Sequence, residues 1–404
     1  MGRHLRAYRQ FCLLVMCWSS ISTYLCFLAQ QEHFIENANT EHVESYITPS
    51  MGAVGIALSS QVEFDTDVTM AQPSCLKYLK DTNITMLFTS NYTTDIKHCV
   101  KNSTFFNSEV INPARTQYIF KNSHICERNT QNDKEVFLLL IILTAPIERM
   151  RRDIIRETWG KLTHADILGK RVAFVFLLGV SESPRVETNI RNENKQYKDI
   201  CKENFIDSYN NLTLKTLMGL RWTVKFCKEA KFVLKIDSDM IPNLPNLVKH
   251  LNDYTYNLEP LFEGHLHPNY APIRAGQNKE RKWNVDESEY PYRVYPPYVN
   301  GPSYLISSDL LPLILTVSAH VKYFRFEDVY MGMIMHVIGV KPKNNGKYSV
   351  QLVYSSSKKK ERNGGMCHFS VAYTGLSPVW SVRDMKLVWT RWEGFNADNC
   401  NNGK

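Results

Sequence analysis

The sequence lacks the short motifs of several common protein classes. It contains no Gly-x-x-x-x-Gly-Lys-Ser/Thr loop, with which P-loop enzymes hold nucleotide phosphates. No Gly-x-Ser-x-Gly turn of a serine hydrolase is present either. Because no Cys-x-x-Cys pair occurs, a zinc site built from cysteines is not expected. Internal repeats and long low-complexity tracts are also missing, so the chain does not read as a repeat protein or a disordered one.

A strong excess of one charge is also missing. The formal net charge is +8 over 404 residues, which is modest for this length. Basic surfaces attract phosphates and acidic sugars, but no stripe of Lys and Arg interleaved with aromatic residues is present, so nucleic-acid binding is not expected. Hydrophobic residues make up 44% and charged residues 22% of the chain. These fractions are typical of a globular protein, long enough for one large domain or two ordinary ones.

The amino end carries a targeting segment. Basic residues within 3–9 precede the apolar run 11–29, which contains no charged residue. Such a run is just long enough to cross a bilayer as one helix, and the basic flank would stay cytoplasmic by the positive-inside rule. The alternative is a cleaved signal peptide, whose apolar region is shorter and ends at small residues. We favour the anchor, which makes the chain a single-pass type II membrane protein with a lumenal main part.

Sequons and cysteines agree with a lumenal location. Seven of the ten cysteines lie outside the apolar run, and most of them should pair in an oxidising compartment. Their odd number leaves at least one free or intermolecular. Asn211 either carries a glycan or caps the helix that follows it. The Asn-x-Ser/Thr sequons stand at Asn83, Asn91, Asn102 and Asn211.

The composition divides the chain into four parts. Residues 1–10 form a cytoplasmic tail and 11–29 the anchor. Residues 30–133 are polar and rich in Asn, Thr and Ser, which predicts a lumenal stem with short or irregular elements. Residues 134–404 contain the apolar and periodic segments, so they form the predicted catalytic domain.

Within that domain the pattern predicts an α/β fold with a mostly parallel central sheet. Continuous apolar runs indicate strands covered on both faces at 136–143, 172–178 and 232–236. Segments 148–159 and 212–226 read as helices between them. Strand–helix alternation implies right-handed crossovers. Ligands of such sheets bind beyond the carboxyl ends of the strands, so the residues at those ends are the first candidates for a site.

Two aspartates follow the third predicted strand. Asp237 and Asp239 are separated by one residue directly after the apolar segment 232–236. Carboxylates at the ligand edge of a sheet suit Mg²⁺ or Mn²⁺, which is held by one or two carboxylates and by the phosphates of a nucleotide. The alternative is a surface turn, where the pattern Asp-x-Asp is also common.

A second acidic pair lies further along the chain. Glu327 and Asp328 stand among aromatic and apolar residues. Partial desolvation raises the pKa of a carboxylate and makes it a better base. The alternative is a helix N-terminus, where the dipole favours acids; both can hold together.

The segment 295–304 reads Tyr-Pro-Pro-Tyr-Val-Asn-Gly-Pro-Ser-Tyr. Its prolines and glycine predict a rigid loop. Its tyrosines offer flat faces on which sugar rings can pack. A purely structural turn explains the same composition equally well.

Taken in order, these segments resemble the β1,3-glycosyltransferase family, which includes β1,3-galactosyltransferases and β1,3-N-acetylglucosaminyltransferases. The resemblance covers about Val136 to Trp389, and its first motif is Arg-Arg-Asp-Ile-Ile-Arg-Glu-Thr-Trp-Gly at 151–160. The other elements are Phe-Leu-Leu-Gly at 176–179, 197–200, 204–216, the Asp-x-Asp motif, Pro-Ile-Arg at 272–274, Lys-Trp at 282–283, Tyr-Pro-Pro-Tyr at 295–298 and Glu-Asp-Val-Tyr at 327–330.

The resemblance implies a GT-A-type fold that binds a UDP-sugar donor together with Mn²⁺ or Mg²⁺. It implies an inverting, single-displacement transfer of a hexose, galactose before N-acetylglucosamine, to the 3-hydroxyl of an acceptor glycan on a glycoprotein or glycolipid. It also implies the Golgi membrane as the location, and protein glycosylation as the process.

The resemblance further implies roles for individual residues. Asp239 coordinates the metal, and Asp237 faces the metal or the nucleotide. Asp328 is the general base that takes the proton of the acceptor hydroxyl. Arginine suits phosphate oxygens, although packing or ion pairing on a helix face is the alternative for such residues. The basic residues implied near the nucleotide are Arg151, Arg156 and, less directly, Lys215.

Several positions depart from the family pattern. Ser238 replaces the middle one of three acids in the metal motif. Val299 stands where the family has a cysteine, so a family disulfide is missing and the pairing of Cys227 and Cys367 is open. Pro302 removes a backbone donor, and Thr374 stands where many members have a histidine. Two readings therefore remain: an active hexosyltransferase, which both acid motifs favour, and a non-catalytic nucleotide-sugar- or glycan-binding relative that acts as an assembly partner.

Overall fold

The computed structural model describes residues 103–112, 116–128, 134–254, 259–276, 281–352, 371–373, 386 and 389–390. All of them belong to one folded unit. The predicted anchor at 11–29 and most of the predicted stem, with three of the four sequons, lie outside the described residues. Among the described helices, none has the length and apolar character needed to cross a membrane.

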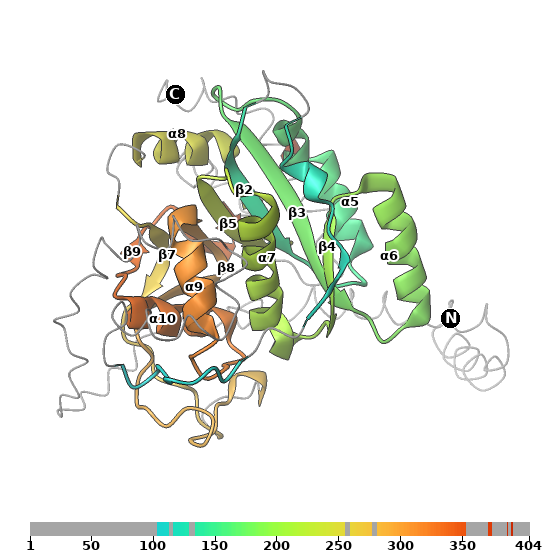
Figure 1. The fold of residues 1–404 in the computed structure, drawn as a ribbon. Coiled ribbons are helices and arrows are strands. Elements are labelled where there is room, and N and C mark those ends of the chain that lie inside the picture. Colours follow the sequence, from blue (N-terminus) through green and yellow to red (C-terminus); the bar gives the residue numbers. More distant parts are fainter. Residues whose placement is uncertain are drawn as a thin grey trace, which may run out of the picture. The chain divides into compact units, whose positions relative to one another are not determined.

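A mixed eight-stranded sheet is the centre of the fold, with the strand order β1-β4-β3-β2-β5-β8-β7-β9 (Figure 1). The four neighbours β4, β3, β2 and β5 run parallel. Beside them, β8 is antiparallel to β5 and β7 is antiparallel to β8. The bounds are β1 Tyr118–Phe120, β2 Val136–Leu143, β3 Arg171–Val180, β4 Ile200–Ile206, β5 Phe232–Asp237, β7 Phe262–His267, β8 Tyr298–Ser307 and β9 Lys343–Asn344. A small second sheet contains β10 Tyr348–Leu352, β11 Val371–Tyr373 and β6 Met240–Pro242.

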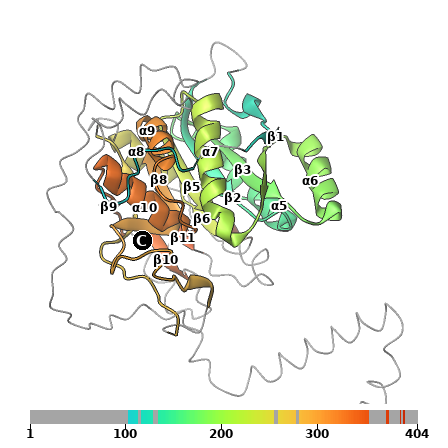
Figure 2. The ribbon, with the colours of Figure 1, turned by 60° about the horizontal axis from the view of Figure 1, so that its bottom comes forward.

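Helices cover both faces of the large sheet (Figure 2). In β2, Leu138 and Leu140 pack into one apolar cluster, and Leu139 and Ile141 pack into the other. Successive side chains of a strand point to opposite faces, which is why this strand is apolar throughout. The first cluster includes side chains of α5 Arg149–Glu157, α6 Pro184–Tyr197 and α8 Leu244–Tyr254. The second includes side chains of α7 Leu212–Phe226, α9 Leu311–Ser318 and α10 Glu327–Ile338.

The predicted strand at 136–143 and the predicted helix at 212–226 are confirmed residue for residue. The strands predicted at 172–178 and 232–236 are each present and slightly longer. The helix predicted at 148–159 is shorter, because α5 ends at Glu157 and a 3₁₀ helix, η4 Trp159–His164, follows it. The α/β architecture is therefore confirmed, with a sheet that is parallel in its middle and mixed at both sides.

Residues of the predicted stem contribute to this unit. Strand β1 is the edge strand and pairs with β4, and Phe105 lies in the core. The side chain of Asn112 donates to the carbonyl of Val321 at 2.5 Å. A disulfide joins Cys126 to Cys227 at the end of α7. This disulfide gives the pairing of Cys227, whereas Cys367 lies outside the described residues. The four-part division of the whole chain stays a prediction.

Gly179, near the end of β3, gives the first testable expectation. A Cβ atom here would lie 2.6 Å from the carbonyl oxygen of Phe205. This oxygen belongs to the backbone of the neighbouring strand and cannot swing away, so the sheet would have to shift. We expect Gly179→Ala to lower the free energy of unfolding by about 1–3 kcal/mol, measured by urea denaturation. Gly346→Ala is the control because a Cβ there meets open space; equal effects of the two changes would contradict the close approach.

Candidate active site

Several of the predicted site residues lie where the parallel strands end. Leu143, the last residue of β2, pairs with Asp237, the last residue of β5. The backbone N–H of Ser238 donates to the carbonyl of Leu143 at 3.0 Å, which holds the metal motif against the end of β2. Asp207 follows β4 and accepts a hydrogen bond from the N–H of Gly179 at 2.7 Å. This edge is the location that the strand pattern predicts for a ligand.

Asp237 and Asp239 both lie at this edge. The side chain of Asp237 is 35% exposed. Burial, and next the negative charge of Asp237, raises the pKa of Asp239 to about 6. A pair of close carboxylates in partly desolvated surroundings is stabilised by a cation. The described residues contain no group of three or more His, Cys, Asp or Glu side chains able to hold a metal. Two carboxylates could hold Mg²⁺ or Mn²⁺ only if phosphates and water complete the ligand set, so the metal stays a prediction.

Arg151 lies beside the metal motif. Its guanidinium is 3.1 Å from Oε1 of Glu148, and its charge acts on Asp239, whose pKa it lowers against the effect of burial. Glu148 also accepts from the hydroxyl of Ser238 at 3.3 Å. The serine that departs from the family pattern thus ties the metal motif to the loop before α5. Arg151 is the predicted phosphate-binding residue that the structure brings to the two aspartates.

Asp328 lies in the first turn of α10, which begins at Glu327. Its Oδ1 accepts from the N–H of Val329 at 2.8 Å, and its Oδ2 accepts from the N–H of Gly301 at 3.1 Å. Burial raises the pKa of Asp328 although these hydrogen bonds act in the opposite direction. Both interpretations of the acidic pair, helix N-terminus and desolvated base, therefore describe the same residues.

The loop predicted at 295–304 is largely a strand. β8 runs from Tyr298 to Ser307, and its pairing with β7 is irregular at Gly264. Gly301 lies in the irregular stretch of β8 between Val299 and Tyr304, and its N–H donates to the carboxylate of Asp328. The prediction that the tyrosines offer faces to sugars is wrong for all three, because Tyr304 is fully buried and Tyr298 and Tyr295 are only 8% and 5% exposed. Tyr298 and Tyr304 pack in the core because β8 is a central strand, and Tyr295 packs in the same cluster just before it.

Lys215 is buried on α7. It donates to Oδ1 of Asp207 at 2.7 Å and to the carbonyl of Thr144 at 2.9 Å. Burial lowers the pKa of Lys215, and Asp207 opposes that effect. These contacts join the ends of β4 and β2. Lys215 therefore stabilises this sheet edge from inside the protein. Its contact with the nucleotide stays a prediction.

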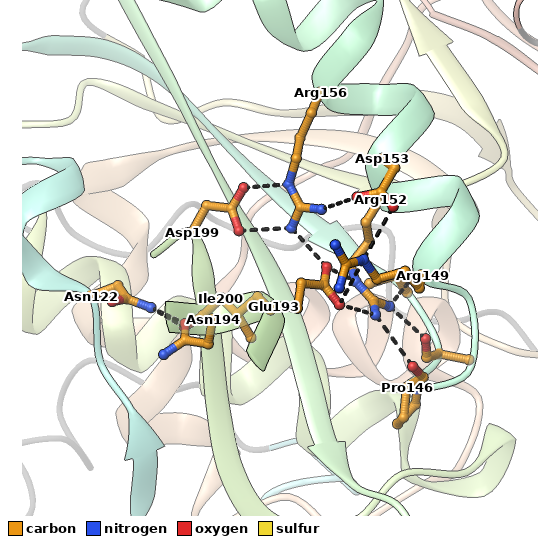
Figure 3. Close-up of polar contacts among 12 residues, drawn as sticks. Asn122, Pro146, Arg149, Arg152, Asp153, Arg156, Glu193, Asn194, Asp199 and Ile200 are labelled. Atoms are coloured by element: carbon orange, nitrogen blue, oxygen red, sulfur yellow. Dashed lines mark hydrogen bonds and ion pairs between the residues drawn. The ribbon is translucent and has the colours of Figure 1, made fainter. Parts of the chain in front are cut away.

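Arg156 does not join the metal motif. Its guanidinium contacts three carboxylates, those of Asp153, Glu193 and Asp199, at 2.7–2.9 Å (Figure 3). It also lies 3.9 Å from the ring centre of Tyr197. The helix rises about 1.5 Å per residue, so Arg156 lies further down α5 than Arg151 and away from the sheet edge. The described contacts of Arg156 match the alternative interpretation, ion pairing, so we do not include it among the proposed nucleotide ligands.

Known proteins resemble this chain over most of its length. A mouse protein named β-1,3-galactosyltransferase 1 is 37% identical over 287 residues, which cover 70% of this chain and 85% of the relative. A rat UDP-GalNAc:β-1,3-N-acetylgalactosaminyltransferase 1 is 37% identical over 218 residues, or 53% of this chain and 64% of the relative. The family model described as Galactosyltransferase matches residues 150–346. The chain belongs to the β1,3-glycosyltransferase family. It is a hexosyltransferase, as the two acid motifs predict.

Solved structures resemble this β1,3-glycosyltransferase only distantly. A glycosyltransferase involved in the glycosylation of the major capsid of PBCV-1 aligns with a TM-score of 0.34 and 12% identity. The alignment covers 62% of this chain and 99% of that one. A likeness this weak adds nothing to the assignment, which rests on the sequence relatives.

The site of this β1,3-glycosyltransferase includes a buried lysine that sequence reasoning missed. Lys235 lies in β5, and its Nζ is 2.6 Å from Oδ1 of Asp237 and 2.5 Å from the carbonyl oxygen of Gly301. Oε2 of Glu327 is 3.5 Å away, and the hydroxyl of Tyr304 donates to the other oxygen of Glu327. The available signal was a single lysine inside an otherwise apolar strand, two residues before the metal motif.

Proposed function

We propose that this chain transfers a hexose, galactose in the first place, from a UDP-sugar to the 3-hydroxyl of an acceptor glycan, with inversion and with the help of a divalent metal. The observation that carries the proposal is the meeting of two acid motifs at one sheet edge. Asp237 and Asp328 are distant in sequence, yet Lys235 and Gly301 connect them. Lys235 contacts Asp237 and the carbonyl oxygen of Gly301, and the N–H of Gly301 donates to Asp328. The names of the mouse and rat relatives support galactose and N-acetylgalactosamine as the donors to test first.

Asp328 acts as the base in this proposal. As the acceptor oxygen forms its bond to the anomeric carbon, the bond from that carbon to the UDP oxygen breaks and UDP leaves with the electron pair. The proton of the acceptor hydroxyl passes to the carboxylate of Asp328. Burial raises the pKa of this carboxylate, which strengthens it as a base. The N–H groups of Gly301 and Val329 hold it in place.

Arg151, Asp237 and Asp239 form the donor side. Asp237 and Asp239 would hold a Mn²⁺ or Mg²⁺ ion, which supplies stabilisation of the negative charge on the departing UDP. Arg151 forms an ion pair with Glu148. In this proposal its guanidinium also binds a phosphate oxygen of the donor, because arginine matches phosphate geometry. With this donor set the acceptor enters from the side of Asp328.

The location of the chain belongs to the same proposal. The basic flank and the apolar run at 11–29 support a single-pass type II protein of the Golgi membrane, with the folded unit in the lumen. Protease protection of intact Golgi vesicles tests this: a tag at the carboxyl end should survive and a tag at the amino end should be digested. The reverse pattern would refute the orientation.

Release of UDP by the lumenal part, residues 30–404, is the decisive measurement. With Mn²⁺ and an acceptor panel, we expect one of UDP-galactose, UDP-N-acetylgalactosamine and UDP-N-acetylglucosamine to be consumed preferentially. EDTA should reduce the rate at least tenfold, because charge on the leaving group is then poorly stabilised. Asp239→Ala should have a similar effect even when Mn²⁺ is saturating.

A matched aspartate makes the result specific. Asp253→Ala changes an exposed residue of α8 and should leave the rate within about twofold of the wild type, as surface substitutions usually do. Activity that EDTA does not affect would refute the metal dependence. Binding of UDP without release from any donor would favour the non-catalytic relative instead.

A further inference from the structure

Lys235 lies between the two acid motifs. Side chains two residues apart in a strand share a face, so Lys235 and Asp237 point to the same side of β5, the side that α10 covers. The lysine side chain is 2% exposed. Its ammonium therefore has protein partners instead of water, and these partners are Asp237, the carbonyl of Gly301 and Glu327.

The peptide of Gly301 connects this lysine to the base. Its carbonyl oxygen accepts from Lys235 at 2.5 Å, while its N–H donates to Oδ2 of Asp328 at 3.1 Å. A second connection runs through Glu327, which contacts Lys235 and accepts from Tyr304. Because Glu327 and Asp328 are neighbours at the start of α10, both connections end on the same helix turn.

We propose that Lys235 is a positioning residue for sugar transfer, whose buried ammonium fixes Asp237 on the donor side and Asp328 on the acceptor side at one separation. The proposal rests on the roles of Asp237 and Asp328 given above. Transfer requires the acceptor oxygen and the anomeric carbon to meet at van der Waals distance, and an error of about 1 Å in such an arrangement costs about 100-fold in rate.

The lysine also selects which oxygen of Asp237 is available. Nζ lies on Oδ1, so Oδ2 is the oxygen left to face a ligand. The ammonium also holds its other partners, Gly301 and Glu327, in place, because a buried ammonium that loses a partner has no water to replace it. Lys235 therefore orders the carboxylates before the substrates bind.

Lys235→Met is the direct test, since it keeps the length of the side chain and removes the charge. Lys202→Met is its matched control: Lys202 is also a buried strand lysine, 2.5 Å from a carboxylate oxygen of Glu187, but it lies on β4 with no contact to the acid motifs. We expect both variants to have a lower melting temperature than the wild type. Only Lys235→Met should lower kcat/KM, by about 100-fold, whereas Lys202→Met should stay within about threefold of the wild type.

Tyr304→Phe tests the second connection with a smaller change. The ring remains, and only the hydroxyl that donates to Glu327 is lost. We expect kcat to fall about tenfold, with the KM of the donor unchanged within about threefold, since Tyr304 does not contact Asp237. In the double variant with Lys235→Met, the loss should be clearly less than the product of the two single losses, because both act on Glu327.

Two results would overturn the proposal. One is a rate of Lys235→Met close to that of Lys202→Met at equal loss of melting temperature. The other is a double variant whose loss equals the product of the single losses. All rates are measured with the UDP-hexose that the wild type uses best, starting from UDP-galactose. A wrong donor assignment would appear in the wild type alone and leave the comparison of variants intact.

Discussion

Asp328→Asn should lower kcat by about 10²–10⁴-fold, the usual contribution of a general base. The amide keeps the shape of the carboxylate but cannot take a proton from the acceptor hydroxyl. It can still accept one of the two backbone hydrogen bonds, from Gly301 or Val329. The measurement is the initial rate of transfer at saturating donor and acceptor, together with UDP binding by calorimetry.

Binding and folding separate this effect from simple damage. Because Asp328 lies on the acceptor side, UDP should bind Asp328→Asn with a Kd within about threefold of the wild type, in line with a residue that acts in the transition state. A melting temperature is recorded for the same sample, since one backbone N–H loses its acceptor. A rate near that of the wild type would mean that another group takes the proton.

Glu193→Gln should destabilise the fold by about 3–5 kcal/mol, because it removes the charge that balances a buried arginine. Arg152 and Glu193 are both fully buried, and the guanidinium binds the carboxylate twice, at 2.7 and 2.8 Å. Arg156 reaches the same carboxylate from the next turn of α5 at 2.8 Å. Figure 3 shows both arginines converging on Glu193. Urea denaturation measures the loss.

The control and the pH dependence sharpen this expectation. Glu229→Gln changes an exposed residue and should alter the free energy of unfolding by less than about 0.5 kcal/mol. Burial alone would raise the pKa of Glu193, but Arg152 and Arg156 lower it below the usual 4.5. The contribution of this carboxylate is thus complete above pH 4.5 and is lost as the pH falls through its folded pKa. The wild type should therefore lose stability in acid more steeply than Glu193→Gln.

The same ion pair explains how a structural residue supports the site. Arg152 also donates to the carbonyl oxygens of Ala145 at 2.9 Å and Pro146 at 3.3 Å. These carbonyls belong to the loop between β2 and α5, which presents Glu148 to the metal motif. A moderate loss of transfer in Glu193→Gln is therefore expected at temperatures where the variant is still folded.

The sequence predicts well those parts of the fold in which the pattern of apolar residues is unambiguous. Segment 136–143 is apolar at every position because helices cover both faces of β2. Asp237 ends β5, which is apolar except for Lys235, and Asp239 follows two residues later. The position of these aspartates at the sheet edge could therefore be predicted from the chain itself. Asp328 needed the family resemblance, since nothing local shows that Gly301 lies against it.

Other elements were missed because their polar residues are paired inside the protein. Strand β4 was not predicted, because it contains the charged residues Lys202 and Glu203, yet both are buried. Their partners are Glu187 on α6 and Arg221 on α7. The ion pairs of Arg156 could not be predicted for the same reason, because its carboxylate partners on α6 and before β4 come from a distant part of the sequence. Its predicted nucleotide role was therefore assigned without them. Ion pairs between remote segments leave no periodic trace.

The short strand β1 has a practical consequence for anyone who shortens this protein. It pairs with β4 at the outer side of the sheet, and the residues around it supply Cys126 to the disulfide. A version cut at residue 134 would leave β4 with an unpaired row of backbone groups and Cys227 with a lone thiol. Bare strands pair between copies and lead to aggregation, and lone thiols cross-link them. A soluble, well-behaved fragment therefore has to include β1, Cys126 and the core residue Phe105.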